Sequence, residues 1–263
     1  MSKIGTLFSS SSGNCTYISS GDEAILVDAG ASSKQILTAL QNNMLDAKQI
    51  KGIFITHTHT DHIKGLRVLL KNINVPVFGS KETLGELLLK GAITDGVNSY
   101  FDIEDKPKFD FNMQIDFFRT SHDCVGSGGY TVMFNNGDKV AVCTDLGVVT
   151  DEIREHIRGS KAIVFESNHD VGMLQNGVYP FETKQRILSE YGHLSNVSCA
   201  EELPYFIKNG TTNIILAHLS KDNNTPDIAR VTSESVLAME GMKNGEDYLL
   251  SVAPAVGGRF SYI

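Results

Sequence analysis

Long hydrophobic runs are missing from this sequence of 263 residues. No apolar stretch approaches the roughly 20 residues that a membrane-spanning helix needs. The first residues (1–5) contain no hydrophobic signal core, and the chain has no short repeat, low-complexity tract or linker rich in Pro or Gly. We therefore expect one continuous cytoplasmic domain over residues 1–263, with no membrane as a partner.

Cysteine is scarce and scattered. The four cysteines stand at positions 15, 124, 143 and 199, and no two of them form a CxxC pair. This spacing argues against a structural zinc knuckle, and reduced thiols are the default for a cytoplasmic protein. We interpret Cys143 and Cys199 as small buried hydrophobic residues.

Positive charge is in short supply, since 23 Lys and Arg face 31 Asp and Glu and the formal net charge is −8. Proteins that track along duplex nucleic acid are usually basic, so extended nonspecific contact with a duplex is disfavoured. Binding of one strand end at a local positive site is compatible with the negative net charge of the chain. Lys64, Arg67 and Lys71 have helical spacing; they either line the rim of a cleft or, as we favour, form an ordinary solvated helix face.

Histidine is what the chain concentrates. The segment 56–62, Thr-His-Thr-His-Thr-Asp-His, follows the apolar run 53–55 and holds three of the eight histidines. The end of a strand can direct His57 and His59 at one metal ion, and the following turn can direct Asp61 and His62 at a second. Imidazole and carboxylate ligands in this mixture suit zinc, manganese or iron. The alternative is a polar loop that holds histidines by chance.

Four more strand ends carry the same chemistry. Asp28, His122, Asp145 and His218 each follow a short apolar run that we predict to be a β-strand. In layered α/β folds, functional sites gather at the carboxyl ends of strands. One such histidine would more often be a core residue, but five strand ends of one chemistry indicate a metal site.

The pattern of elements predicts two related halves within an α/β (α+β) fold. Strands interleaved with helices favour two mixed sheets packed face to face, with helices outside. The polar stretch 91–112 reads as a surface excursion, and Pro204 should kink or shorten its helix. We expect strands near 3–8, 15–19, 24–28, 53–56, 76–79, 114–119, 129–135, 139–144, 161–166 and 213–217, and helices near 32–43, 62–72, 81–90, 149–157, 182–190, 196–208 and 224–240.

The order of these residues, with HxHxDH at 57–62, resembles the metallo-β-lactamase superfamily. The resemblance implies a four-layer αββα sandwich and a cofactor of two divalent metal ions. It assigns His57, His59 and His122 to the first ion and Asp61, His62 and His218 to the second, with Asp145 bridging both. Asp28 in that pattern is a support that orients the histidine loop.

Three further segments bear on the substrate. The serine-rich loop 9–15 could cradle an anion through residues such as Ser12 and Asn14, or it is only a hairpin turn. His193 lies in a turn just before a helix, where it can meet a phosphate, unless Ser195 or Asn196 merely caps that helix.

The third segment, 165–170, contains Glu166 and His169. Both could reach into the cleft, with Glu166 orienting His193, or the segment is solvated at the rim.

The motifs SSSSGN, ESNHD and GHLSN together look like the YycJ/WalJ family, which resembles single-domain 5′-to-3′ DNA exonucleases. The set Glu166, His193 and His218 is also similar to the ribonuclease Z arrangement. By that resemblance His193 is the general acid, tuned by Glu166. The chain lacks the long arm of ribonuclease Z enzymes and the large insertion of β-CASP nucleases.

We therefore predict a binuclear metal-dependent hydrolase of phosphodiester bonds, acting as a 5′-to-3′ DNA exonuclease. A metal-bridging hydroxide, oriented by Asp61, would attack phosphorus in line. The alternatives are a small-molecule or cyclic phosphodiesterase, a glyoxalase II-like thioesterase, and a non-enzymatic module with a relic metal site. The complete ligand set argues against a relic. The expected partner is a DNA strand end or a small phosphodiester, and the oligomeric state is left open.

Overall fold

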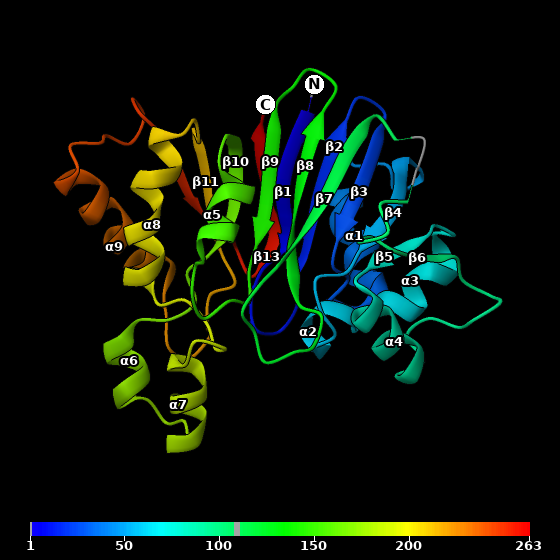
Figure 1. Cartoon of the computed structure of the whole chain (residues 1–263), viewed down its shortest axis with the longest axis horizontal. Helices are drawn as coiled ribbons and strands as arrows, with labels where there is room; N and C mark the ends of the chain where they lie inside the picture. The colour runs from blue at the N-terminus through cyan, green and yellow to red at the C-terminus, as the bar shows by residue number, and fades with distance from the viewer. Residues whose placement is uncertain (1, 108–110) are drawn as a thin grey trace.

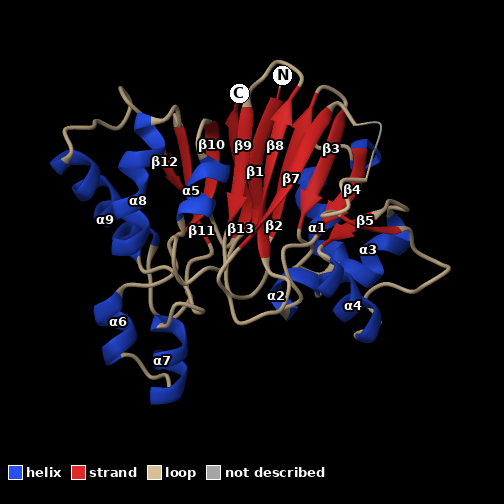
Figure 2. Ribbon diagram, viewed as in Figure 1, coloured by secondary structure: helices blue, strands red, loops and turns tan. Residues whose placement is uncertain are grey.

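Two mixed β-sheets lie face to face in the computed structural model, which describes residues 2–107 and 111–263 (Figures 1 and 2). The first sheet has the strand order β13-β1-β2-β3-β4-β5-β6. Its strands are β1 (Ser2–Phe8), β2 (Cys15–Ser20), β3 (Glu23–Val27), β4 (Ile50–Phe54), β5 (Val77–Gly79), β6 (Tyr100–Asp102) and β13 (Val256–Tyr262).

The second sheet has the order β12-β11-β10-β9-β8-β7. It comprises β7 (Met113–Arg119), β8 (Gly128–Phe134), β9 (Lys139–Cys143), β10 (Ser160–Glu166), β11 (Asn213–Ala217) and β12 (Leu249–Val252). Each sheet begins with antiparallel hairpins, β1–β2–β3 and β7–β8–β9, and continues with parallel strands. The parallel pairs need crossover connections, which the helices supply.

Helices cover the outer face of each sheet. The first sheet carries α1 (Ser33–Asn42), α3 (Leu66–Asn72) and α4 (Lys81–Leu89), at the right of Figure 1; the second carries α5 (Asp151–Ile157), α8 (Asn196–Lys208) and α9 (Pro226–Met239), at the left. The short α2 (Thr60–Ile63) lies at the lower edge, and α6 (Val171–Asn176) and α7 (Phe181–Leu188) project below it. A 3₁₀ turn, η1 (Ala47–Gln49), precedes β4.

The core forms three layers because successive strand residues point to opposite faces. In β3, Ile25 packs in the cluster between the two sheets, whereas Leu26 packs in the cluster under the first set of helices. In β10, Val164 and Phe165 divide in the same way between the central layer and the second set of helices. Strands buried on both faces explain the continuous apolar runs. The predicted αββα sandwich is confirmed.

Local chemistry sets where several helices begin. Ser32, Ser80, Thr150, Ser195 and Thr225 are the N-cap residues of α1, α4, α5, α8 and α9, and each side chain accepts a hydrogen bond from a backbone N–H three residues on. The cap at Ser195 leaves His193 two residues upstream, in the turn that approaches the site.

The predicted helix 62–72 is wrong as one element, since the chain forms α2 and α3 with Gly65 between them. Gly65 N donates to Ala29 O at 2.8 Å. A Cβ at Gly65 would lie only 2.0 Å from Ala31 O, so this close approach requires glycine. The histidine loop is thereby held against the segment that follows β3.

Pro204 does not shorten α8, which runs without interruption from Asn196 to Lys208. Residues on both sides of it, Leu203 and Phe206, are fully buried against the second sheet, and this packing outweighs the lost backbone donor.

The stretch 91–112 is not only a surface excursion, because Tyr100–Asp102 forms β6 beside β5; positions 108–110 lie outside the described residues. The strands β12 and β13 and the helix α6 were not predicted. Within the described ranges, no helix is long and apolar enough to cross a membrane.

Candidate metal centre

The histidine loop is held by Asp28, which follows β3. Its Oδ1 accepts the backbone N–H of Thr56 at 2.9 Å, and its Oδ2 accepts the Thr56 hydroxyl at 2.9 Å and His62 Nδ1 at 2.8 Å. Asp28 is 3% exposed. A buried carboxylate on Nδ1 fixes the tautomer of His62 and directs Nε2 toward the site. This geometry fits the support role expected of Asp28.

Backbone hydrogen bonds also hold the histidine loop in place. Asn14 N donates to Asp61 O and Ala29 N donates to His62 O, both at 2.8 Å. A Cβ at Gly30 would come within 1.6 Å of Asp61 O, so only glycine permits this approach. The loop that carries the candidate ligands is therefore held by two neighbouring segments.

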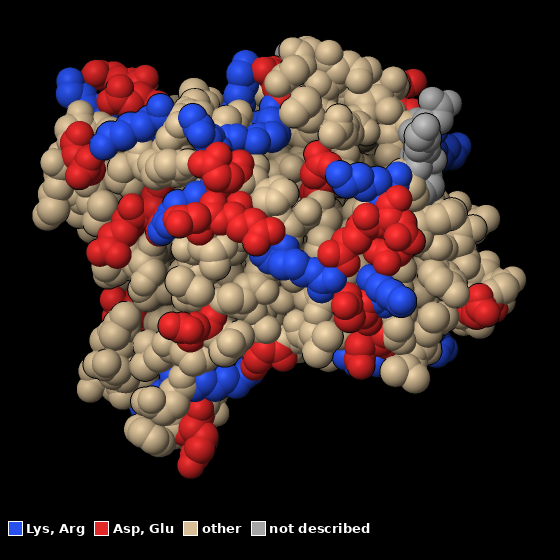
Figure 3. All heavy atoms as spheres, in the orientation of Figure 1, with Lys and Arg blue, Asp and Glu red and all other residues tan. Residues whose placement is uncertain are grey.

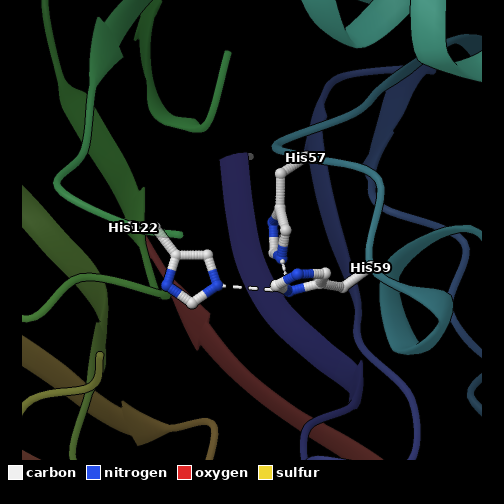
Figure 4. Close-up of side chains that lie close together, drawn as sticks. All are labelled: His57, His59 and His122. Carbon is white, nitrogen blue, oxygen red and sulfur yellow. Dashed lines mark hydrogen bonds between the residues drawn. The ribbon is translucent and has the colours of Figure 1, made fainter. Parts of the chain in front are cut away.

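Three imidazoles converge from the two halves of the molecule (Figure 4). His59 Nδ1 lies 3.1 Å from His57 Nε2 and 3.2 Å from His122 Nε2. Nitrogen ligands of a tetrahedral zinc ion, each about 2.0–2.1 Å from the metal, stand roughly 3.3 Å apart. His59 thus has, from each of the other two rings, the separation that a shared metal ion requires, and the three ligand atoms all lie within 4.8 Å of one another.

A second set of atoms has the same separation. Asp61 Oδ2 lies 3.4 Å from both His62 Nε2 and His218 Nε2, and Asp145 Oδ2 lies 3.3 Å from His62 Nε2. The other oxygen of Asp145, Oδ1, is 3.8 Å from His122 Nε2 and 4.0 Å from His57 Nε2. Oδ1 also lies 3.5 Å from His218 Nδ1. Asp145 therefore stands between the two sets, with Oδ2 toward the second set and Oδ1 near residues of both.

Asp145 Oδ2 also supplies a test of fit. It is buried and makes no hydrogen bond with any residue that the structure describes. A buried carboxylate oxygen in this state carries a large desolvation penalty unless a cation binds it. The donor set of neutral imidazoles and carboxylates around it suits a divalent ion.

The protonation of the first set favours metal binding. Burial and the adjacent imidazoles hold the pKa of His57 well below its usual value. Burial also lowers the pKa of His59 and His122. The rings are therefore neutral near pH 7, which is the form that donates a lone pair to a metal.

The second set carries an excess of carboxylate. Burial alone would lower the pKa of His62, but Asp145 and Asp28 raise it well above its usual value. Burial opposes the shift at His218 too, yet Asp145 and Asp61 raise the pKa of His218 to about 10. These carboxylates attract positive charge, and a bound cation would satisfy them in place of protons.

Backbone strain is concentrated at the same strand ends. Asp28, Asp145 and His218 have φ values of 65°, 61° and 57°. This left-handed region costs a residue with a side chain about 1–3 kcal/mol when the surroundings impose it. Three such residues in one cluster, each ending a strand, point to geometry maintained for a function.

Glu166 lies behind the cluster at the end of β10. Its Oε1 accepts His193 Nδ1 at 2.9 Å and His218 Nδ1 at 2.7 Å, while Oε2 accepts the backbone N–H groups of Leu146 and Leu194. Although burial raises the pKa of Glu166, His193 and His218 lower it overall, so the group is ionised. Glu166 orients both histidines, whereas the sequence suggested only His193.

The cluster opens into a cleft of about 450 Å³ at the lower edge of the molecule. Figure 3 shows this edge hollowed between the projecting α6–α7 pair and the helices of the first half. One wall is the cluster with Ser11 and Asn168, and the other is α7 with the residues just before it; the lining includes Tyr179, Thr183, Arg186 and Ile187.

The three predicted substrate residues fall in different places. Ser12 lines a neighbouring cavity, while Ser11 lines the metal-centre cleft. Asn14 Nδ2 lies 3.1 Å from Asp61 Oδ2 and 3.0 Å from His62 Nε2, so its amide contacts two candidate ligand residues. His169 is 1% exposed, and its ring nitrogens have no hydrogen-bond partner among the described residues.

Sequence reasoning missed residues in the cleft and beside it. Asp123 Oδ1 lies 3.5 Å from His122 Nε2 and 3.8 Å from His59 Nε2, and Asp123 pairs with Arg186 of α7. Adjacency to His122 was the available signal for Asp123. No local sequence pattern marks Arg186, because only the tertiary fold brings α7 to the cleft.

Comparison with known proteins gives the family. A profile described as the metallo-beta-lactamase superfamily matches residues 10–191. The chain belongs to the metallo-beta-lactamase superfamily. It is 38% identical over 246 residues to exodeoxyribonuclease YycJ of Bacillus anthracis, covering 93% of this chain and 92% of that protein. It is 34% identical over 255 residues to exodeoxyribonuclease WalJ of Streptococcus pneumoniae, covering 94% of each.

A solved structure shows the same fold. The metallo-beta-lactamase fold protein YhfI of Bacillus subtilis superposes with a TM-score of 0.71 at 16% identity, covering 99% of each chain. At that identity the likeness concerns the fold alone. Family membership and the histidine–aspartate cluster together indicate a site for divalent metal.

Proposed function

We propose that this protein is an exodeoxyribonuclease that uses two divalent metal ions to hydrolyse DNA from the 5′ end. The observation that carries the proposal is 38% identity over 93% of the chain to a protein named as an exodeoxyribonuclease, combined with a full set of ligand residues at one cleft. In each set, neighbouring ligand atoms lie 3.1–3.4 Å apart, which supports a pair of ions.

The residues would divide as follows. His57, His59 and His122 would hold one ion, Asp61, His62 and His218 would hold the other, and Asp145 would be a ligand of both. Zinc, manganese and iron all suit these ligands. Two divalent ions at such a site supply an activated water and offset the charge on phosphoryl oxygens. Asp61 would orient the attacking water, and Asn14, whose amide donates to Asp61 Oδ2, would hold that carboxylate in place.

His193 would act as the general acid. Its Nδ1 is bound to Glu166, so its other ring nitrogen is the one available to a substrate in the cleft. Its side chain is 16% exposed, while that of His218 is 3% exposed, so His193 is the more accessible of the two rings on Glu166. In that position it can donate a proton to the oxygen that leaves phosphorus.

End-labelled DNA provides the test. Single- and double-stranded oligonucleotides labelled at either end are incubated with protein loaded with zinc, manganese or iron. We expect a 5′ label to be released at once as a short product, and a 3′ label to persist on progressively shorter strands. Asp145→Asn is the matched control for contaminating nucleases. Intact DNA, together with hydrolysis of cyclic nucleotides or S-lactoylglutathione, would overturn the proposal in favour of a small-molecule hydrolase.

We place this activity in the cytoplasm, within a single domain over residues 1–263. All four cysteines are free, and Cys15, Cys143 and Cys199 are buried, which fits a reducing compartment.

A further inference from the structure

A second cavity, of about 500 Å³, lies next to the metal-centre cleft. Ser220 lines both, and the serine loop divides them, with Ser11 on the cleft side and Ser12 on the cavity side. Small-molecule sites usually have volumes of about 300–1000 Å³. This cavity is therefore large enough for a ligand of its own, and it adjoins the site of the reaction.

Its charge is opposite to that of the protein as a whole. Lys64 and Lys221 line the cavity, and no Asp or Glu does, although the chain has a net charge of −8. Within the described ranges neither lysine forms an ion pair, since the ion pairs of the structure lie elsewhere. Two unpaired ammonium groups in an acid-free cavity form a local site for an anion.

The remaining lining suits the rest of a nucleotide. Phe8, Leu219 and Ala253 give the cavity an apolar side. Gln35 adds an amide whose Oε1 is bound to Ser32 and whose Nε2 can donate a hydrogen bond to a ligand. An apolar wall accepts the face of a base, because stacking and burial do not depend on its identity. Cationic and apolar parts in one cavity match a phosphate joined to a base.

The wall between the two sites is built firmly. Ser12 N donates to Ser10 Oγ at 3.2 Å, and Gly13 N donates to Ser10 O at 3.1 Å. Ser10 N donates to Asn14 Oδ1 at 3.1 Å, and Asn14 in turn contacts Asp61. The cavity therefore has a fixed position relative to the metal centre.

We propose that this cavity binds the nucleotide next to the scissile phosphate of a DNA strand, with Lys64 and Lys221 at its phosphate and the apolar side against its base. The proposal rests on the proposed function, because it needs a strand that continues beyond the metal centre. It would account for strand-end binding by an acidic protein.

The test compares two substrates in one protein. Bis-p-nitrophenyl phosphate has no phosphate besides the one that is cleaved, so it offers nothing for the two lysines to bind, whereas a 5′-labelled single strand carries further phosphates. In the double variant Lys64→Gln/Lys221→Gln, the ratio of kcat/KM on the strand to that on the ester should fall at least about tenfold, through KM, because charged hydrogen bonds are lost. The slope of the logarithm of the strand-binding constant against the logarithm of the salt concentration should become less steep by about 0.7 for each lost phosphate contact.

Two further variants make the result specific. Lys71→Gln removes the same charge from the exposed face of α3, outside the cavity, and should keep the ratio. Ala255→Glu adds a carboxylate to an exposed position of the lining and should lower the ratio as the lysine changes do. An equal loss in Lys71→Gln, or an unchanged ratio in the double variant, would overturn the proposal.

Thymidine 5′-monophosphate separates this inference from the proposed function. If the wild-type protein hydrolyses the ester but not DNA, the exonuclease proposal fails, and titration with the mononucleotide still tests the cavity. Binding that is lost in the double variant supports a nucleotide site. Absence of binding, or binding that the double variant retains, overturns it.

Discussion

The floor of the metal-centre cleft and its rim are built in different ways. The floor consists of buried imidazoles and carboxylates, and Asp28 and Glu166 hold these groups from behind with short hydrogen bonds. The rim is α7 and the segment before it, where no residue of Phe181–Leu188 is buried. Tyr179 Oη donates to Asp222 Oδ2 at 2.8 Å, and Arg186 pairs with Asp123.

This difference suggests that the floor serves the reaction and the rim serves substrate binding. Hydrogen bonds inside a buried polar network are strong and costly to break, so the floor keeps one geometry. Exposed ion pairs contribute only about 0–1 kcal/mol, so the rim can change without disturbing the ligands. We expect substitutions at the floor to affect the reaction itself, and substitutions at the rim to affect mainly how the substrate is held.

The largest effect is expected from the floor carboxylates. Asp145→Asn and Asp61→Ala should each lower phosphodiesterase turnover at least about a hundredfold, on DNA and on bis-p-nitrophenyl phosphate alike. Metal content and circular dichroism establish that the variants are loaded and folded. Near-normal turnover in either metal-loaded variant would show that substitutions at the floor do not affect the reaction more than substitutions at the rim.

The second largest loss of turnover is expected for His193→Ala, and the size of this loss should depend on the leaving group of the substrate. General acid catalysis usually contributes about 10²–10⁴-fold, and we expect the lower end of that range on DNA. The p-nitrophenyl ester needs little protonation, so its turnover should fall much less. Equal losses on both substrates would refute the general-acid role. Loss of metal would mean that His193, rather than His218, is the ligand.

Asp28→Asn tests the support behind the floor. The amide cannot accept all three hydrogen bonds from Thr56 and His62, so metal affinity should fall about 10–100-fold. At saturating metal most of the turnover should return, which a direct catalytic role would not allow. The matched control is Asp22→Asn, an exposed carboxylate in the turn before β3. Metal titration of both variants, followed by activity at each metal concentration, checks the prediction.

The smallest effect is expected at the rim. Arg186→Gln breaks the pair with Asp123 and should change KM for DNA by less than about tenfold, with metal content unchanged. Arg158→Gln, which breaks an exposed pair with Glu155 on α5, is the control and should change neither. A loss of turnover as large as that of Asp145→Asn would show that Arg186 takes part in the reaction, and the expected difference between rim and floor would then be wrong.

The sequence by itself determined the fold and the order of the cluster. Alternation and apolar runs are local properties, so β1, β3, β9 and β11 could be predicted within about a residue. The candidate ligands follow such runs, and strand ends of a sheet meet at one edge. The ligand roles, the general acid and the single domain stay predictions that the experiments above address.

Only the tertiary structure decided which side chains share a partner. Glu166 lies between His193 and His218, which are far apart in the sequence, and no local pattern encodes that contact. The break at Gly65 depends on the nearby carbonyl of Ala31. Adjacent serines of one loop line different cavities, and both cavities also include Ser220 from the second half of the chain, so no local pattern places them. Periodicity specifies the face of an element, whereas distances across the cleft follow from how the sheets pack.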